Sequence, residues 1–98
     1  MTGKERQTAP SRELILESHD FPGEYIVKAF GPGSNEFRKQ VRACAVEVMG
    51  EKRVITSERA TRSGHRICVT LTLEANTVEE VQRVYHRVCD VPGLMFLL

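Results

Sequence analysis

The stretch from residue 66 to residue 75, RICVTLTLEA, decides the fold. Apolar residues occupy every second position from Ile67 to Ala75, and mostly polar residues occupy the positions between them. This period of two is typical of a β-strand that buries only one of its faces. We therefore predict a strand here, with one face in the core and the other face open.

Three further strands are predicted around this one, each bounded by Gly, Pro or Ser turns: residues 25–30, 53–63 and 95–98. The first is an apolar run broken only by Lys28 and closed by the turn Gly31-Pro32-Gly33. Ser63-Gly64 provides a turn that joins the second strand to residues 66–75 as a hairpin. The second strand carries the charge expected of a protected sheet edge.

Two amphipathic helices are predicted between these strands. The first begins with Ser34 or Asn35 as N-cap and ends at Gly50. The second opens with a capping box formed by Thr77 and Glu80 and ends before the Pro92-Gly93 turn. The order β-α-β-β-α-β predicts an α+β fold of the ferredoxin-like type. In that fold a four-stranded antiparallel sheet has strands one and three at its centre and two helices on one face.

The apolar residues are distributed unevenly along the 98 residues. Residues 1–20 hold few of them, so we predict a flexible N-terminal tail there, disordered over 1–12 and loosely docked over 13–20. Residues 21–98 are predicted to form a single domain. No apolar run approaches the roughly 20 residues of a membrane span, and the N-terminus has no signal-peptide pattern. We expect a cytoplasmic protein that does not enter a membrane.

The three cysteines fit the same compartment. Cys44, Cys68 and Cys89 are odd in number and form neither a C-x-x-C pair nor a zinc-like cluster. We expect free thiols packed as small apolar side chains, with no metal and no cofactor.

Short motifs in the chain resemble the YbeD-like family of small bacterial proteins of unknown function. The motifs that carry the resemblance are Phe21-Pro22, Lys28, Gly31, Ser63-Gly64, the alternation over 67–73, Tyr85, Val91-Pro92-Gly93 and Leu97-Leu98. Members are similar in shape to ACT domains, which bind small effectors and regulate enzymes through domain pairing. The resemblance implies a regulatory or binding module and transfers no catalytic residue.

Acylphosphatases are similar in size and strand order, but they need an Asn early in the third strand, where this chain has Cys68. We expect no enzyme.

A first candidate site is the turn that leads into the first helix. Glycines let a backbone approach a ligand, and a helix N-terminus attracts anions. A small anionic metabolite could be held by Gly31, Gly33, Ser34 and Asn35, with Lys28 and Arg38 nearby. The alternative is that the glycines serve the turn geometry and that Ser34 or Asn35 only caps the helix.

A second candidate is the face of the sheet that the helices leave uncovered. Strand alternation directs four large apolar side chains to that face: Ile26, Phe30, Phe96 and Leu98. An exposed apolar patch indicates a surface for a protein partner or for self-association. The alternative is ordinary scattered exposure.

A third candidate is the basic hairpin over residues 52–66, whose net charge is +4 although the whole chain carries only +1. Its cations are Lys52, Arg53, Arg59, Arg62 and Arg66. A nucleic-acid-binding module could use them against phosphate. RNA-recognition domains of this topology also stack bases on aromatic residues of the central strands, and strand three has none. We therefore expect edge protection here, with nucleic-acid binding as the alternative function.

Overall fold

The computed structural model describes residues 9–98. Its elements in chain order are α1 (Arg12–Ser18), β1 (Gly23–Pro32), α2 (Asn35–Met49), the 3-10 turn η1 (Glu51–Arg53), β2 (Val54–Ala60), β3 (Arg66–Ala75), α3 (Val78–Cys89) and β4 (Phe96–Leu97). Within this part of the chain, no helix is long and apolar enough to cross a membrane.

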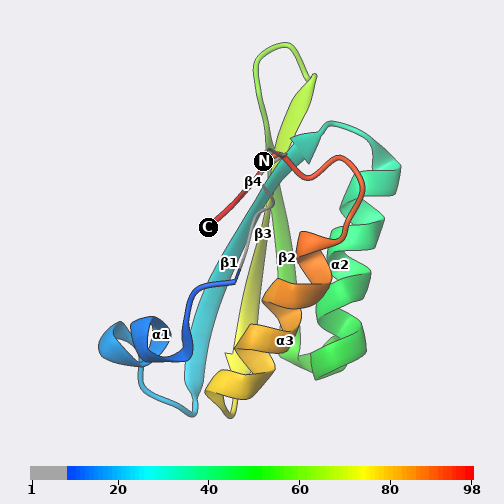
Figure 1. Ribbon diagram of the computed structural model, residues 1–98. Coiled ribbons are helices and arrows are strands. Elements are labelled where there is room, and N and C mark those ends of the chain that lie inside the picture. Colours follow the sequence, from blue (N-terminus) through cyan, green and yellow to red (C-terminus); the bar gives the residue numbers. More distant parts are fainter. Residues whose placement is uncertain (1–8) are drawn as a thin grey trace.

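The four strands form one antiparallel sheet with the order β2-β3-β1-β4. The central strands β1 and β3 pair over their full length, from Gly23 opposite Ala75 to Pro32 opposite Arg66. Helices α2 and α3 lie side by side on one face of the sheet, and the β2–β3 hairpin projects past them (Figure 1). The predicted ferredoxin-like α+β fold, with strands one and three at the centre, is confirmed.

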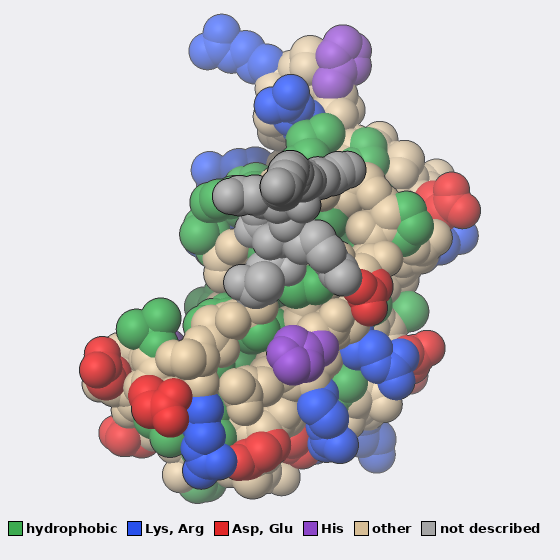
Figure 2. Space-filling view, in the orientation of Figure 1, with side chains coloured by type: hydrophobic (Ala, Val, Ile, Leu, Met, Phe, Trp, Pro, Cys, Tyr) green, Lys and Arg blue, Asp and Glu red, His purple; other side chains and the backbone are tan. Residues whose placement is uncertain are grey.

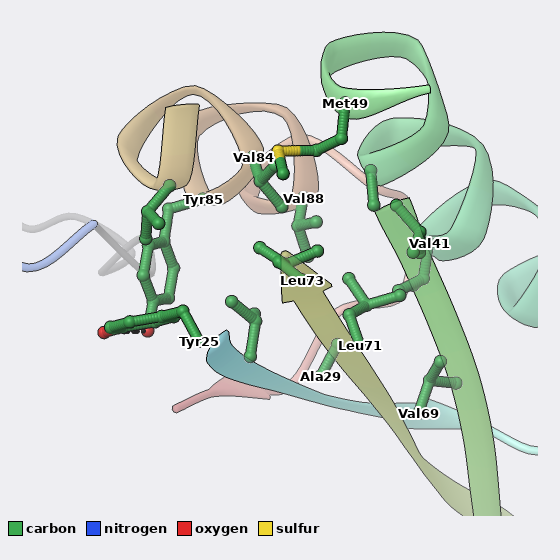
Figure 3. Packing of buried hydrophobic residues seen from close by; sticks show 14 of the residues in the cluster. Tyr25, Ala29, Val41, Met49, Val69, Leu71, Leu73, Val84, Tyr85 and Val88 are labelled. Carbon is green, nitrogen blue, oxygen red and sulfur yellow. Dashed lines mark hydrogen bonds between the residues drawn. The ribbon is translucent and has the colours of Figure 1, made fainter. Parts of the chain in front are cut away.

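The core lies between the sheet and these two helices (Figure 3). Along β3 every second side chain is buried, as the alternation predicts, and Val69, Leu71 and Leu73 have no exposed surface. They meet buried residues of both helices, among them Val41 and Val84. Burial of this apolar surface, at about 25 cal/mol per Å², is the main term that holds the layers together.

Both main helices begin at the predicted caps. The Ser34 hydroxyl accepts the N–H of Phe37 at 3.1 Å, and the Thr77 hydroxyl accepts the N–H of Glu80 at 3.3 Å. The Glu80 carboxylate reaches back to the backbone, as a capping box requires. It accepts the N–H of Asn76 at 2.8 Å, and a backbone hydrogen bond from Thr77 also helps to lower the pKa of Glu80.

The N-terminal segment has more structure than the sequence suggests. Residues 13–20 were expected to be only loosely docked, yet α1 forms here with Ser11 as its N-cap. Ile15 is 2% exposed and belongs to the main core, and Arg12 forms an ion pair with Glu79 of α3 at 2.5 Å. One well-placed apolar side chain can therefore anchor a short helix in an otherwise polar segment. The disorder predicted over residues 1–12 does not extend to residues 9–12, where Ala9 packs against the core and Ser11 caps α1. Residues 1–8 lie outside the described residues.

Candidate binding surface

We call the side of the sheet away from α2 and α3 the open face. In β1, Ile26, Lys28 and Phe30 point to the open face, because they alternate with the fully buried Val27 and Ala29. Ile26 is 48% exposed, whereas Phe30 is half-buried. Side chains that are directly opposite in paired strands share a face, so the strand register identifies the rest of this surface.

One row of side chains crosses the open face from edge to edge. Arg59 of β2 is opposite Cys68 of β3, Cys68 is opposite Phe30 of β1, and Phe30 is opposite Phe96 of β4. The two phenylalanine rings have centroids 5.8 Å apart and planes inclined by 52°. Phe96 is 49% exposed. The row therefore places an aromatic pair and an arginine on the same surface.

Other exposed apolar residues of the open face lie outside this row. Beyond a polar row formed by Ser57, Thr70 and Lys28, Ile55 of β2, Thr72 of β3 and Ile26 of β1 are aligned, and Ile55 is 68% exposed. Leu98 exchanges two backbone hydrogen bonds with Lys28 and lies at the β4 edge, 54% exposed. All four residues predicted for a partner surface, Ile26, Phe30, Phe96 and Leu98, thus lie on the open face or at its edge.

A groove of about 470 Å³ opens at the hairpin end of the open face. Its lining is mainly apolar and includes Phe30, Phe96, Met95 and Cys68, with Arg59 and Arg66 among the lining residues. Within residues 9–98 the guanidinium groups of these two arginines form no ion pair. Figure 2 shows Lys, Arg and His side chains projecting at the hairpin end, whereas Asp and Glu side chains lie on the rest of the molecule, together with further Lys and Arg.

The two glycines of the first turn are explained by packing. A Cβ atom on Gly31 would lie 2.4 Å from the ring of Phe37, and one on Gly33 would lie 2.3 Å from the carbonyl oxygen of Gly64. The Gly33 N–H also donates to the carbonyl of His65 at 3.0 Å. The turn is therefore held against both α2 and the β2–β3 hairpin.

The polar residues predicted to bind an anion at this turn do not converge. Arg38 forms an ion pair with Glu58 at 3.0 Å and donates to the Asn35 side chain at 2.6 Å, while Ser34 caps α2. Lys28 points to the open face, on the other side of the sheet from Arg38. The structure thus separates Lys28 from the rest of the predicted set and engages Arg38, Asn35 and Ser34 in contacts within the protein.

The predicted basic hairpin is likewise divided into two groups. Lys52 and Arg53 lie in η1, before β2 begins, whereas Arg59, Arg62 and Arg66 lie toward the hairpin tip. Arg53 donates to Glu80 at 2.6 Å and to the backbone carbonyl of Glu74 at 3.0 Å. The hydrogen bond from Arg53 is the main cause of the lowered pKa of Glu80. Arg53 therefore has a structural role at the start of α3.

One of the cysteines is disfavoured as a nucleophile. Cys44 and Cys68 are free thiols, and all three cysteines are half-buried. Burial raises the pKa of the Cys44 thiol, with a further contribution from Glu47, which disfavours the thiolate. Among the described residues, no group of three or more His, Cys, Asp and Glu side chains is arranged to hold a metal ion.

The sequence does not predict the complete row from Arg59 to Phe96. It predicts Phe30 and Phe96 together as part of a partner surface, but it assigns Arg59 and Cys68 to other roles. Their alignment depends on the hairpin register and on the pairing of β4 with β1, neither of which the strand patterns specify. Met95, which lines the same groove, was not considered as a site residue.

Strand order, helix placement and the uncovered sheet define a ferredoxin-like α+β domain with one open face. Residues 17–98 match the family described as "Protein of unknown function (DUF493)", and the chain belongs to that family. YbeD belongs to the same family, whose function is unknown. No curated protein shows significant similarity to the chain.

Proposed function

We propose that this protein is a non-enzymatic, regulatory docking domain of the ACT-like kind that binds a partner protein through its open face. The observation that carries this proposal is that Ile26, Ile55, Phe30 and Phe96 all lie on the side of the sheet that no main helix covers, on both sides of a polar row that contains Lys28. Large apolar side chains gathered on one exposed face mark an interaction surface. We also propose a cytoplasmic location, which the free thiols of Cys44 and Cys68 favour.

The chemistry of the open face suggests what kind of protein it binds. Phenylalanine, methionine and arginine are enriched at protein interfaces, and all three occur around the Phe30–Phe96 pair. Arg59 and Arg66 lack acidic partners within residues 9–98, so an acidic surface on the partner would complement them. We therefore propose a partner with an apolar contact surface flanked by Asp or Glu.

The proposal of a non-enzymatic role is supported by the first turn. Arg38 is the arginine near the turn that an enzyme could use to contact phosphate. Its guanidinium group instead forms an ion pair with Glu58 and donates a hydrogen bond to the Asn35 side chain. The glycines of the turn are accounted for by their contacts with Phe37 and the hairpin.

The test compares proteins retained by the immobilised wild-type chain with those retained by two variants. Ile26→Ser/Phe96→Ser removes apolar side chains from the open face. The control Leu16→Ser removes one that is similarly exposed (43%) but belongs to α1. We expect one partner to be lost with the open-face variant and kept by the control. Calorimetry with the purified partner should then show at least a tenfold loss of affinity for the open-face variant.

Three outcomes would contradict the proposal. A partner whose affinity is the same for both variants would place docking elsewhere. Concentration-dependent dimerisation in sedimentation velocity, lost only with Ile26→Ser/Phe96→Ser, would assign the face to self-association. Salt-dependent retention of RNA or DNA through the same face would favour the nucleic-acid alternative.

A further inference from the structure

We infer that the groove at the hairpin end of the open face is a binding site for a small molecule that joins an aromatic or branched aliphatic body to a phosphate or carboxylate group. This binding activity is distinct from protein docking, although the two surfaces share Phe30, Phe96, Arg59 and Arg66. It also lies on the opposite side of the sheet from α2 and Arg38, and therefore from the anion site that the sequence suggested.

The size and lining of the groove fit a small ligand. Its volume of about 470 Å³ falls within the roughly 300–1,000 Å³ that is typical of small-molecule sites, which combine apolar walls with a few polar groups. The inclined rings of Phe30 and Phe96 and the side chain of Met95 provide the apolar part of the lining. Cys68 lies between Arg59 and Phe30 in the row that crosses the sheet. An apolar body of one ring or one branched chain would be desolvated there.

The charge around the groove selects an anion. Arg59 is directly opposite Cys68, and Arg66 is on the same face of β3, two residues before Cys68. The nearest acidic residue in sequence, Glu58, points to the helix side of the sheet and pairs with Arg38 at 3.0 Å. Arginine presents a planar set of N–H donors that matches phosphate and carboxylate oxygens.

The acidic residues of the open face lie too far away to neutralise these arginines. Glu24 and Glu74 are opposite each other in the β1–β3 pairing, at the other end of the face. Glu74 is six residues along β3 from Cys68, which is about 20 Å at 3.3 Å per residue. This exceeds the Debye length of about 8 Å at physiological ionic strength. Arg59 and Arg66 are therefore available to bind an external anion.

The experiment uses phenyl phosphate and phenylacetate as probes, because each combines a ring with an anionic group. Inorganic phosphate supplies the anion alone, and benzyl alcohol supplies the ring alone. Binding is followed through backbone amide chemical shifts of the ¹⁵N-labelled full chain. We expect saturable shifts at Phe30, Cys68 and Phe96 with at least one ring-bearing anion, at concentrations at which neither component alone gives them.

Matched variants test the role of the arginines. Arg59→Gln/Arg66→Gln should weaken binding of the probe at least tenfold. Arg83→Gln, on the exposed surface of α3, should leave the affinity within twofold of the wild-type value. All these substitutions replace exposed side chains, and the dispersion of the amide spectrum checks that each variant is folded.

Four results would overturn the inference: no shifts at the groove with either ring-bearing probe, equal shifts with inorganic phosphate, equal shifts with benzyl alcohol, or equal weakening by Arg83→Gln. Ile26→Ser separates this site from the docking proposal, because Ile26 does not line the groove. Probe binding that survives Ile26→Ser while partner docking is lost would support both proposals. Probe binding without any docking partner would support this site alone.

Discussion

The hydroxyl oxygens of Tyr25 and Tyr85 lie 3.1 Å apart in the core and join β1 to α3. Both side chains are buried, and their rings meet edge to face with centroids 6.0 Å apart. Burial, followed by the hydrogen bond with Tyr25, raises the pKa of Tyr85 far above its usual value. Tyr85 therefore stays neutral at physiological pH. The pair forms a buried hydrogen bond between β1 and α3 inside an otherwise apolar core.

Tyr85→Phe should destabilise the protein by about 1–3 kcal/mol, because it leaves the Tyr25 hydroxyl buried without this partner. Tyr25→Phe/Tyr85→Phe removes both hydroxyls, so its cost should be smaller than the sum of the two single costs. Urea denaturation of the four proteins measures this difference. Strictly additive losses would show that the hydroxyls do not depend on each other.

The contrast between β3 and this tyrosine pair shows what the sequence could reveal. The alternation from Ile67 to Ala75 predicts which side chains of β3 are buried, because a strand has a fixed period. The Tyr25–Tyr85 bond joins residues 60 positions apart and depends on how α3 settles on the sheet. No local pattern contains that information.

Ile15→Ala should destabilise the protein by about 2 kcal/mol or more, because Ile15 is 2% exposed and anchors α1 to the core. Leu16→Ala, at a 43% exposed position of the same helix, should cost about 0.5 kcal/mol or less. Denaturation gives the free energies, and amide hydrogen exchange should show faster exchange in α1 of the Ile15 variant. Equal, small effects of both substitutions would mean that α1 is docked only loosely, as the composition of residues 13–20 suggests.

Glu80→Gln should destabilise the protein at neutral pH by about 1 kcal/mol, because the charged hydrogen bond from Arg53 is weakened. The pKa of Glu80 is lowered in the folded protein, so its ionised form contributes stability above the ordinary Glu pKa. That contribution is lost as the pH falls through the lowered folded-state pKa. The difference between wild type and variant should therefore be largest at pH 7 and vanish in acid.

Glu79→Gln is the matched control for this pH profile. Glu79 pairs with Arg12, but both side chains are more than half exposed, so little stability is expected from the pair. Urea denaturation from pH 7 to pH 3 should show a pH-dependent difference for Glu80→Gln and almost none for Glu79→Gln. A pH-independent loss in Glu80→Gln would assign the role of Glu80 to its uncharged contacts.

The candidate surface was only partly predictable, because local patterns indicate which face a side chain is on but not which strands pair or in what register. Alternation in β1 indicates that Ile26 and Phe30 face away from the helices, and they do. The alignment of Arg59 with Cys68 depends on where the hairpin turn falls, and a shift of one residue would send Arg59 to the other face. Pairing between strands far apart in the sequence, such as β4 with β1, then brings Phe96 to Phe30.

Gly31→Ala should destabilise the protein by about 1–3 kcal/mol, because the added methyl group would lie 2.4 Å from the buried ring of Phe37. Phe37→Leu makes room beside Gly31, so Gly31→Ala/Phe37→Leu should lose less stability than the two single losses combined. Urea denaturation measures the coupling. This result decides between the two interpretations of the turn: a glycine kept for α2 packing is rescued by a smaller neighbour, whereas a glycine kept for close approach of a ligand is not. Additive losses would therefore reject the packing explanation and return the turn to consideration as a binding site.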